Sequence, residues 1–325
     1  MPPRTRKMVE TTLPGIDEIL KASERISGVA TVTPLVEIPA LSRVARREVY
    51  LKLECFQPIK VFKIRGAYNK VSQVRANSVV AASSGNHGIA VAYSSHLLSK
   101  KCTVVVPETA VKEKVDTILD YGAEVVKAGT LSSEREAKAR DIARSTGAVF
   151  IHPFNDPDVI AGQGTCGLEI AKQLRDFDSV LVPVGGGGLI SGISIALKAL
   201  GLEAKIFGVE PLGAPKLSAS LNAKKAVVVP SPKSIADGLL PSALGRLTWQ
   251  ACSKNVDGAF TPSEDEILGA TRLMAKTARV IAEPSGAAAL APLLSSASRT
   301  LGRRVVVVVS GGNISLDLLR EILAS

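Results

Sequence analysis

The chain has 325 residues, of which 46% are hydrophobic and 4% aromatic, a composition that allows one large or two ordinary domains with an aliphatic core. Its formal net charge of +10 raises the question of nucleic-acid binding. The basic residues are spread along the chain without interleaved aromatic residues, and no nucleic-acid-binding motif is recognisable. We therefore predict no nucleic-acid partner and a basic surface that favours anionic metabolites.

Hydrophobic segments and cysteine usage indicate the cellular compartment. No apolar stretch has the length needed to cross a bilayer, and no secretory signal is recognisable at the start. The four cysteines are dispersed without a CxxC pair, as is typical of reduced thiols. We predict a cytoplasmic protein with no membrane partner.

Strand-like and helix-like segments alternate along the chain. In chain order we expect strands at 79–82, 102–106, 125–126, 148–151, 180–184, 206–209 and 305–309, with helices at 112–121, 132–146 and 189–200. This alternation predicts an α/β fold with open, mostly parallel sheets and flanking helices. Residues 74–149 are predicted to form a small domain and residues 1–73 and 150–325 a large one, with a ligand cleft between them.

Three glycine-rich corners follow predicted strands: Ser83–Gly88, Gly185–Gly188 and Ser310–Asn313. Ligands of open parallel sheets bind beyond the carboxyl ends of the strands. Glycine lets backbone N–H groups approach a phosphate or carboxylate, and a following helix N-terminus adds positive potential. The corners therefore predict a site for an anionic ligand.

Lys63 lies upstream of these corners between the apolar residues Phe62 and Ile64. A lysine held against a hydrophobic wall is desolvated, which lowers the pKa of its amine as a Schiff-base lysine requires. With three corners, Lys63 predicts a cradle for a phosphorylated aldehyde, pyridoxal 5'-phosphate (PLP). His87, beside Asn86 in the first corner, is predicted to border this site. Scattered histidines and unpaired cysteines argue against structural zinc.

The glycine run at Gly185–Gly188 has a second interpretation. Gly186, Gly188 and Gly192, with Glu210 at the end of the next predicted strand, resemble a dinucleotide fingerprint with its ribose-binding acid. Taken alone, this corner leaves PLP chemistry and an NAD(P)-dependent oxidoreductase equally open.

Motifs in one consistent order over nearly the whole chain resemble the fold-type-II PLP enzymes, specifically the serine/threonine dehydratase and serine racemase family. They are Thr33–Leu35, Glu54–Pro58, Phe62–Tyr68, Ser83–Gly88, Ala161–Thr165, Gly185–Gly188, Ala236–Gly238, Glu283–Gly286 and Ser310–Asn313. The resemblance decides against the dinucleotide interpretation. It implies a fold like the β-subunit of tryptophan synthase, PLP in the interdomain cleft and a homodimer.

The resemblance also implies roles for single residues. Lys63 would form the imine bond to PLP and Phe62 would back the pyridine ring. Gly185, Gly186, Gly187 and Gly188 would bind the phosphate. Asn86 would contact the phenolic oxygen and Ser310 the pyridine nitrogen. Ser83, Asn86, His87 and Arg135 match positions where the family handles the substrate carboxylate or the mouth of the site.

The predicted reaction is β-elimination from L-threonine and L-serine to 2-oxobutanoate or pyruvate plus ammonia. A substrate amine would displace Lys63, leaving a base beside the α-carbon. Ser310, being neutral, does not force protonation of the pyridine nitrogen, so the weaker electron sink lets loss of the β-hydroxyl compete. Ser84, a serine as in the racemase-like branch, leaves two alternatives: a second base that racemises serine, or a hydroxyl that caps the following helix.

The racemase-like branch holds a divalent cation near a Glu-Pro-x-x-Ala-x-Asp segment. Here Glu210 and Ala214 are retained, but Lys216 replaces the last acid. A lysine removes an oxygen ligand and repels the ion, so we predict that no divalent metal binds. Lys216 then either satisfies the charge of Glu210 or points into solvent. Ile59–Val61 replaces the usual Thr-Gly-Ser-like trio, with an open consequence for the substrate.

Overall fold

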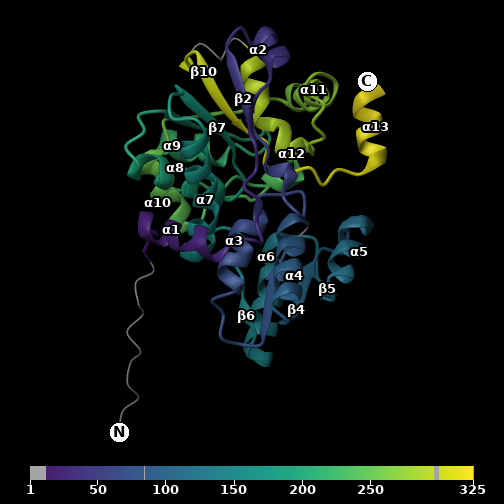
Figure 1. The fold of residues 1–325 in the computed structure, drawn as a ribbon. Coiled ribbons are helices and arrows are strands. Elements are labelled where there is room, and N and C mark those ends of the chain that lie inside the picture. The colour runs from purple at the N-terminus through teal and green to yellow at the C-terminus, as the bar shows by residue number, and fades with distance from the viewer. Residues whose placement is uncertain (1–11, 84, 296–299, 325) are drawn as a thin grey trace.

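The computed structural model (Figure 1) describes residues 12–83, 85–295 and 300–324. Its strands are β1 Leu35–Glu37, β2 Glu48–Lys52, β3 Ser78–Ala82, β4 Lys101–Val106, β5 Glu124–Lys127, β6 Val149–Phe150, β7 Ser179–Pro183, β8 Lys205–Val209, β9 Gly258–Phe260 and β10 Arg304–Val308. Its α-helices are α1 Ile16–Arg25, α2 Pro39–Ala45, α3 Lys63–Val71, α4 Asn86–Leu97, α5 Lys112–Asp120, α6 Ser132–Thr146, α7 Pro157–Gln173, α8 Gly188–Ala199, α9 Lys216–Ala223, α10 Arg246–Asn255, α11 Glu264–Leu273, α12 Pro284–Ala287 and α13 Leu316–Ala324. Shorter helical segments are η1 Glu54–Phe56, η2 Asp237–Leu239, the π-helical η3 Met274–Ala278 and η4 Ala288–Leu294.

The larger sheet has six strands in the order β1-β2-β10-β7-β8-β9. Its strands pair in parallel except β1 with β2, which are antiparallel. The central strand β10 is buried on both faces, as parallel strands covered by helices are. Val305 and Val307 pack toward α2, α11 and η4, whereas Val306 and Val308 pack toward α7, α8 and α10. This alternation divides the aliphatic core into two layers.

The smaller sheet has four parallel strands in the order β5-β4-β3-β6. Helices α3, α4 and α5 share a core with one face, and Ala139 of α6 packs with Val80 and Val105 on the other. Figure 1 shows this sheet below the larger one. The predicted fold class of two mostly parallel sheets with flanking helices is confirmed. The domain boundaries at 73/74 and 149/150 stay a prediction.

Helices α3 and α7 cross at two glycines. A β-carbon at Gly162 would lie 2.4 Å from the carbonyl oxygen of Arg65, and one at Gly66 would lie 2.7 Å from the carbonyl oxygen of Val159. The two backbones therefore approach more closely than any side chain would allow. In Figure 1, α3 lies between the regions of the two sheets. Because Gly66 is in the first turn of α3, its contact with α7 fixes the position of that turn.

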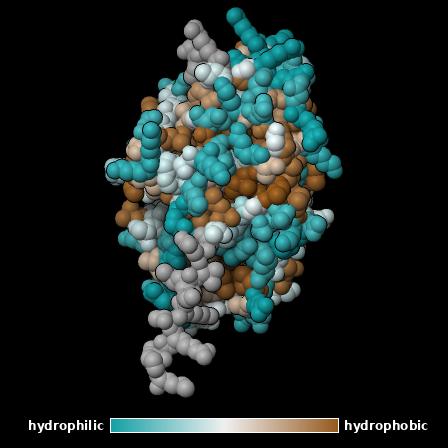
Figure 2. Space-filling view, turned by 90° about the vertical axis from the view of Figure 1, so that its left-hand side faces the viewer, coloured by the Kyte–Doolittle hydropathy of each residue, from teal (hydrophilic) through white to brown (hydrophobic). Residues whose placement is uncertain are grey.

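Among the described residues, no helix is both long and apolar enough to cross a bilayer. Figure 2 shows hydrophobic residues interspersed with hydrophilic ones over one face of the molecule. Such mixing is normal at the surface of folded proteins.

Candidate active site

Lys63 begins α3 directly beside the corner that follows β10. The N–H of Phe62 donates to the carbonyl of Ser310 (3.1 Å), and the N–H of Gly312 donates to the carbonyl of Lys60 (2.8 Å). Two segments almost 250 positions apart are thus paired backbone to backbone. The structure brings together the lysine and the serine that the sequence singled out.

The amine of Lys63 has few polar partners. Its Nζ donates to the carbonyl of Pro153 (3.0 Å) and lies 5.1 Å from the centre of the Phe62 ring. Burial lowers the pKa of Lys63 to about 8 because the charged ammonium loses water. About one tenth of the amine is therefore neutral at pH 7, far more than at an exposed lysine, and the neutral form is the one that attacks an aldehyde.

The glycines of Gly185–Gly188 leave no room for side chains. A β-carbon at Gly186 would lie 2.2 Å from the ring of Phe154, and Gly187 has a φ of +90°, which side chains rarely adopt. Thr248 donates its hydroxyl to the carbonyl of Gly186 (2.7 Å). The loop ends at the N-terminus of α8, so its backbone suits a phosphate. Phe154 directly follows Pro153, the acceptor for Lys63, and so links the loop to the lysine.

The first and third corners meet through the side chain of Asn86, the first residue of α4. Its Nδ2 donates to Oε1 of Glu283 (2.6 Å), and its Oδ1 accepts from Nδ2 of Asn313 (2.8 Å). Both bonds fix the plane of the Asn86 amide. Ser83 accepts from the N–H of Gly85 (3.1 Å), closing the turn before α4. Ser84 lies outside the described residues.

Glu283 also belongs to the site, although no role was predicted for it from the sequence. Its side chain is buried, and Oε2 has no hydrogen-bond partner within the described residues. Burial first, and then the nearby charge of Asp237, raise the pKa of Glu283 to about 7. The sequence signal that could have identified it is a carboxylate that follows the apolar Ala282 and precedes Pro284 and the small residues after it. Buried oxygens are nearly always hydrogen-bonded, so Oε2 of Glu283 leaves one acceptor open at the site.

His87 and Arg135 have different surroundings. His87 is buried, donates from Nε2 to the carbonyl of Ile151 (2.9 Å), and has its pKa lowered to about 3 by burial and by the charge of Lys63. It is therefore neutral. Arg135 is buried in the first turn of α6, where it donates to the carbonyl of Thr130 (3.0 Å) and the hydroxyl of Ser132 (2.9 Å). These contacts lie within its own turn, and its role toward a substrate stays a prediction.

Lys216 is buried and does not point into solvent. Of the two predicted alternatives, the structure has the one in which Lys216 pairs with Glu210. Its Nζ lies 3.3 Å from Oε2 of Glu210, with both side chains at 0% exposure. The ammonium also donates to the carbonyls of Ala214 (3.0 Å) and Leu239 (2.9 Å). Two backbone N–H groups of α9 donate to Glu210. The ammonium thus lies among oxygen atoms, as a bound cation would.

These residues fit PLP. The amine of Lys63, with its lowered pKa, suits an aldehyde, and the glycine cradle suits a phosphate. Ser310 and Asn86 place polar groups in the corners beside them. The arrangement defines a site for a cofactor that carries both a carbonyl and a phosphate.

Comparison with known proteins agrees. The chain matches the family model described as "Pyridoxal-phosphate dependent enzyme" over residues 26–311. It is 40% identical over 312 residues to the L-threonine ammonia-lyase of Thermotoga maritima, covering 95% of this chain and 78% of that protein. It is 38% identical over 311 residues to the beta-hydroxyaspartate dehydratase of Paracoccus denitrificans, covering 94% and 98%. The chain therefore belongs to the PLP-dependent enzymes.

The solved structures place it within that family. Maize serine racemase superposes with a TM-score of 0.91 at 35% sequence identity, covering 95% of this chain and 97% of that one. The fold is accordingly that of the fold-type-II PLP enzymes, in which ammonia-lyases and racemases are related.

Proposed function

We propose that this protein removes the β-hydroxyl group of L-threonine and L-serine, releasing 2-oxobutanoate or pyruvate and ammonia, with PLP bound to Lys63. The observation that carries the proposal is the amine of Lys63, its pKa lowered to about 8, placed beside the corner that contains Ser310. When bound, PLP supplies an electron sink for the α-carbon of the substrate.

The residues of the chain have distinct tasks in this reaction. Lys63 would take the α-proton of the substrate, and the carbonyl of Pro153 orients its Nζ. Gly185–Gly188 hold the phosphate with backbone N–H groups. Ser310 would offer the pyridine nitrogen a neutral hydroxyl rather than a carboxylate, a partner that favours loss of the substrate's β-hydroxyl group. Asn86 donates one Nδ2 hydrogen to Glu283, and its second Nδ2 hydrogen would donate to the phenolic oxygen of PLP.

The experiment combines cofactor mapping with a substrate panel. Purified protein should be yellow, and borohydride reduction should leave pyridoxyl mass on the peptide that contains Lys63. Assay of 2-oxo acid should give product from L-threonine and L-serine, with 3-hydroxyaspartate as the third substrate because one relative is a hydroxyaspartate dehydratase. Lys63→Ala should abolish product, whereas Lys254→Ala, a change of an exposed lysine of α10, should not. Silence of the wild type on both threonine and serine would sink the proposal.

Serine racemisation is the second candidate, favoured by whole-chain similarity to maize serine racemase. Racemisation needs a second base on the face of the substrate opposite Lys63, and we propose Ser84 for this role. Chiral analysis of residual serine should then find the D-isomer in the wild type and not in Ser84→Ala, while elimination persists. A wild type that never produces D-serine is a dehydratase only.

We also propose a cytoplasmic homodimer. Phe56 and Ile281 are 53% and 45% exposed, and both belong to segments that flank Gly312, where a β-carbon would contact the carbonyl of Ile281 and the side chain of Cys55. Neighbouring exposed apolar side chains favour a protein interface. Light scattering of the purified protein measures the mass that decides between monomer and dimer.

A further inference from the structure

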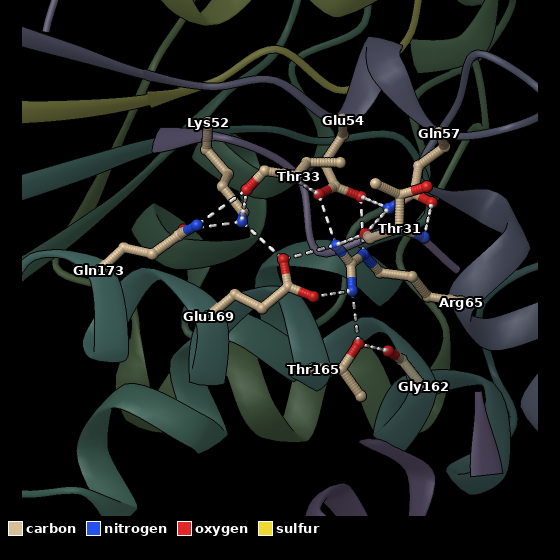
Figure 3. A network of polar contacts seen from close by, with 10 residues as sticks. All are labelled: Thr31, Thr33, Lys52, Glu54, Gln57, Arg65, Gly162, Thr165, Glu169 and Gln173. Carbon is tan, nitrogen blue, oxygen red and sulfur yellow. Dashed lines mark hydrogen bonds and ion pairs between the residues drawn. The ribbon is translucent and has the colours of Figure 1, made fainter. Parts of the chain in front are cut away.

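Four charged side chains form a buried cluster where β2, α3 and α7 meet (Figure 3). Lys52, Glu54 and Arg65 have side chains at 0% exposure, and Glu169 is at 14%. The two positive and two negative charges balance. None of the four has a task in the reaction proposed above.

Arg65 lies at the centre of this charged cluster. Its Nε and Nη2 donate to the two carboxylate oxygens of Glu54 at 2.7 and 2.8 Å, and its Nη1 and Nη2 donate to those of Glu169 at 2.6 and 2.8 Å. Nη1 also donates to the hydroxyl of Thr165 (3.1 Å), and Nη2 to the carbonyl of Thr31 (3.2 Å). Every N–H direction of the guanidinium is used, and the two carboxylates hold it from two sides.

Lys52 completes the charged cluster from the end of β2. Its Nζ donates to Glu169 (2.6 Å), to the carbonyl of Thr33 (2.7 Å) and to Oε1 of Gln173 (2.9 Å). Thr33 in turn donates to Glu54 (2.6 Å). Each charge therefore has an ionic partner, and the three fully buried ones, Lys52, Glu54 and Arg65, also have neutral hydrogen bonds. Buried charges are tolerated under this condition.

The charged cluster is tied to the strand end that carries Ser310. The N–H of Val309 donates to the carbonyl of Lys52 (2.9 Å), and the N–H of Cys55 donates to the carbonyl of Val309 (3.1 Å). Glu54 lies between these two bonded residues, two positions after Lys52 and one before Cys55, and Ser310 follows Val309 directly. A shift of Glu54 relative to Ser310 would therefore break backbone pairing.

The charged cluster is also tied to Lys63. Arg65 lies in the first turn of α3, two residues after Lys63, and its carbonyl is the atom on which Gly162 of α7 packs. Glu169 belongs to the same α7, which begins four residues after Pro153, the acceptor for Lys63. Arg65 consequently joins the helix of the lysine to the strand end of the serine and to the helix behind both.

We propose that Arg65 is a positioning residue for Lys63, and that its guanidinium sets the start of α3 relative to Ser310. The aldehyde carbon and the nitrogen of PLP lie at opposite ends of one rigid ring, so the groups that bind them need a fixed separation. Buried ion pairs seldom stabilise a fold more than apolar residues of the same size. A rigid, planar fork instead gives geometric specificity that a lysine does not. The inference rests on the proposed role of Lys63.

The test compares Arg65→Lys with Lys70→Gln in the PLP-bound protein. Arg65→Lys keeps the charge and removes the fork. Lys70→Gln removes the other ion pairs between α3 and the start of α7, those to Asp156 and Asp158, which are partly exposed. The readouts are the dissociation constant for PLP, the circular dichroism of the PLP absorption band per bound PLP, and the melting temperature. The circular dichroism reports how rigidly the ring is held.

We expect Arg65→Lys to weaken PLP binding about tenfold and to reduce the circular dichroism about twofold or more, with Lys70→Gln unchanged in both. Glu169→Gln leaves the Arg65–Glu54 pair in place and should move both readouts in the same direction, which keeps the test decisive if Arg65→Lys does not fold. The proposal is overturned if these variants melt lower but keep the PLP affinity and circular dichroism of Lys70→Gln. Failure of the proposed function would appear separately, as pyridoxyl mass on another peptide of the wild type.

Discussion

Burial acts on two ionisable groups of the candidate active site in opposite directions. The pKa of Lys63 falls to about 8 and that of Glu283 rises to about 7. In both cases the neutral form gains, because a charge loses its water when the fold closes around it. The site thereby provides an amine that loses its proton more readily than an ordinary lysine, and a carboxyl that is partly protonated near neutral pH.

Glu283→Gln tests the carboxyl through stability. The pKa of Glu283 is about 7 in the folded chain against an ordinary 4.5, so the native state binds more protons between these values and loses stability as pH rises through them. Glutamine is neutral throughout. We expect Glu283→Gln to raise the free energy of unfolding by up to about 3 kcal/mol at pH 8 and to give no gain at pH 4.5, measured by denaturant unfolding.

Glu134→Gln is the control for this measurement. Glu134 is exposed and accepts hydrogen bonds from the N–H groups of Thr130 and Leu131, which lower its pKa. Its ionised form therefore stabilises the fold at pH 8, and the variant should lose stability where Glu283→Gln gains it. Equal behaviour of the two variants would contradict the assigned pKa of Glu283.

At the scale of elements, the contact between α3 and α7 matters most for the site because Lys63 begins one helix and Pro153 precedes the other. The helices touch where Gly66 faces Val159 and Gly162 faces Arg65. The charged cluster around Arg65 lies on the same contact. The close backbone packing and the guanidinium of Arg65 therefore stabilise the same contact between α3 and α7.

Gly162→Ala should disturb this contact. The added methyl would lie 2.4 Å from the carbonyl of Arg65 and 2.6 Å from the Cα of Gly66, both backbone atoms that move only with their helix. We expect a loss of about 1–3 kcal/mol in the free energy of unfolding and weaker PLP binding. Gly269→Ala in α11, where a β-carbon meets nothing within 4 Å, should instead stabilise by about 0.5–1 kcal/mol. A loss from both variants would show helix-wide intolerance rather than the close contact.

The elements themselves were predictable, but their neighbours were not. The helix at 132–146 and the buried strand before Gly185 follow from local patterns, and the structure has them as α6 and β7. The charged cluster around Arg65 was not predicted. Arg65 and Glu169 resemble surface residues of helices in sequence, and their burial arises only when β2, α3, α7 and the segment at Thr31 meet. The role of Glu283 was missed for the same reason.

At the scale of the whole molecule, a series of contacts runs from the core of the larger sheet to the smaller one. Lys216 donates to the carbonyl of Leu239, the last residue of η2. Asp237, the first residue of η2, forms an ion pair with Lys114 of α5 at 2.6 Å. α5 packs against the smaller sheet, so the position of η2 affects how the two sheets face each other. Lys216 therefore holds a segment that bridges the molecule.

The last prediction concerns the ammonium of Lys216 as a resident cation. Burial raises the pKa of Glu210 and lowers that of Lys216, and their mutual attraction opposes both shifts. With this charge supplied by the chain, activity and melting temperature of the wild type should be indifferent to EDTA and to added Mg²⁺. Clear loss of activity on chelation, restored by Mg²⁺ or Mn²⁺, would contradict the prediction.

Variants at position 216 test whether the charge of Lys216 takes the place of a metal ion or whether its side chain only fills space. Lys216→Met leaves Glu210 buried without its partner and should lose about 3–5 kcal/mol of stability, with no recovery in Mg²⁺. Lys216→Asp loses at least as much in EDTA, because two carboxylates then face each other. It adds oxygen ligands beside Glu210 and the carbonyl of Ala214, the kind of set that Mg²⁺ and Ca²⁺ prefer. We therefore expect divalent ions to raise the melting temperature of Lys216→Asp alone; equal responses of the two variants would show that the site has no affinity for cations.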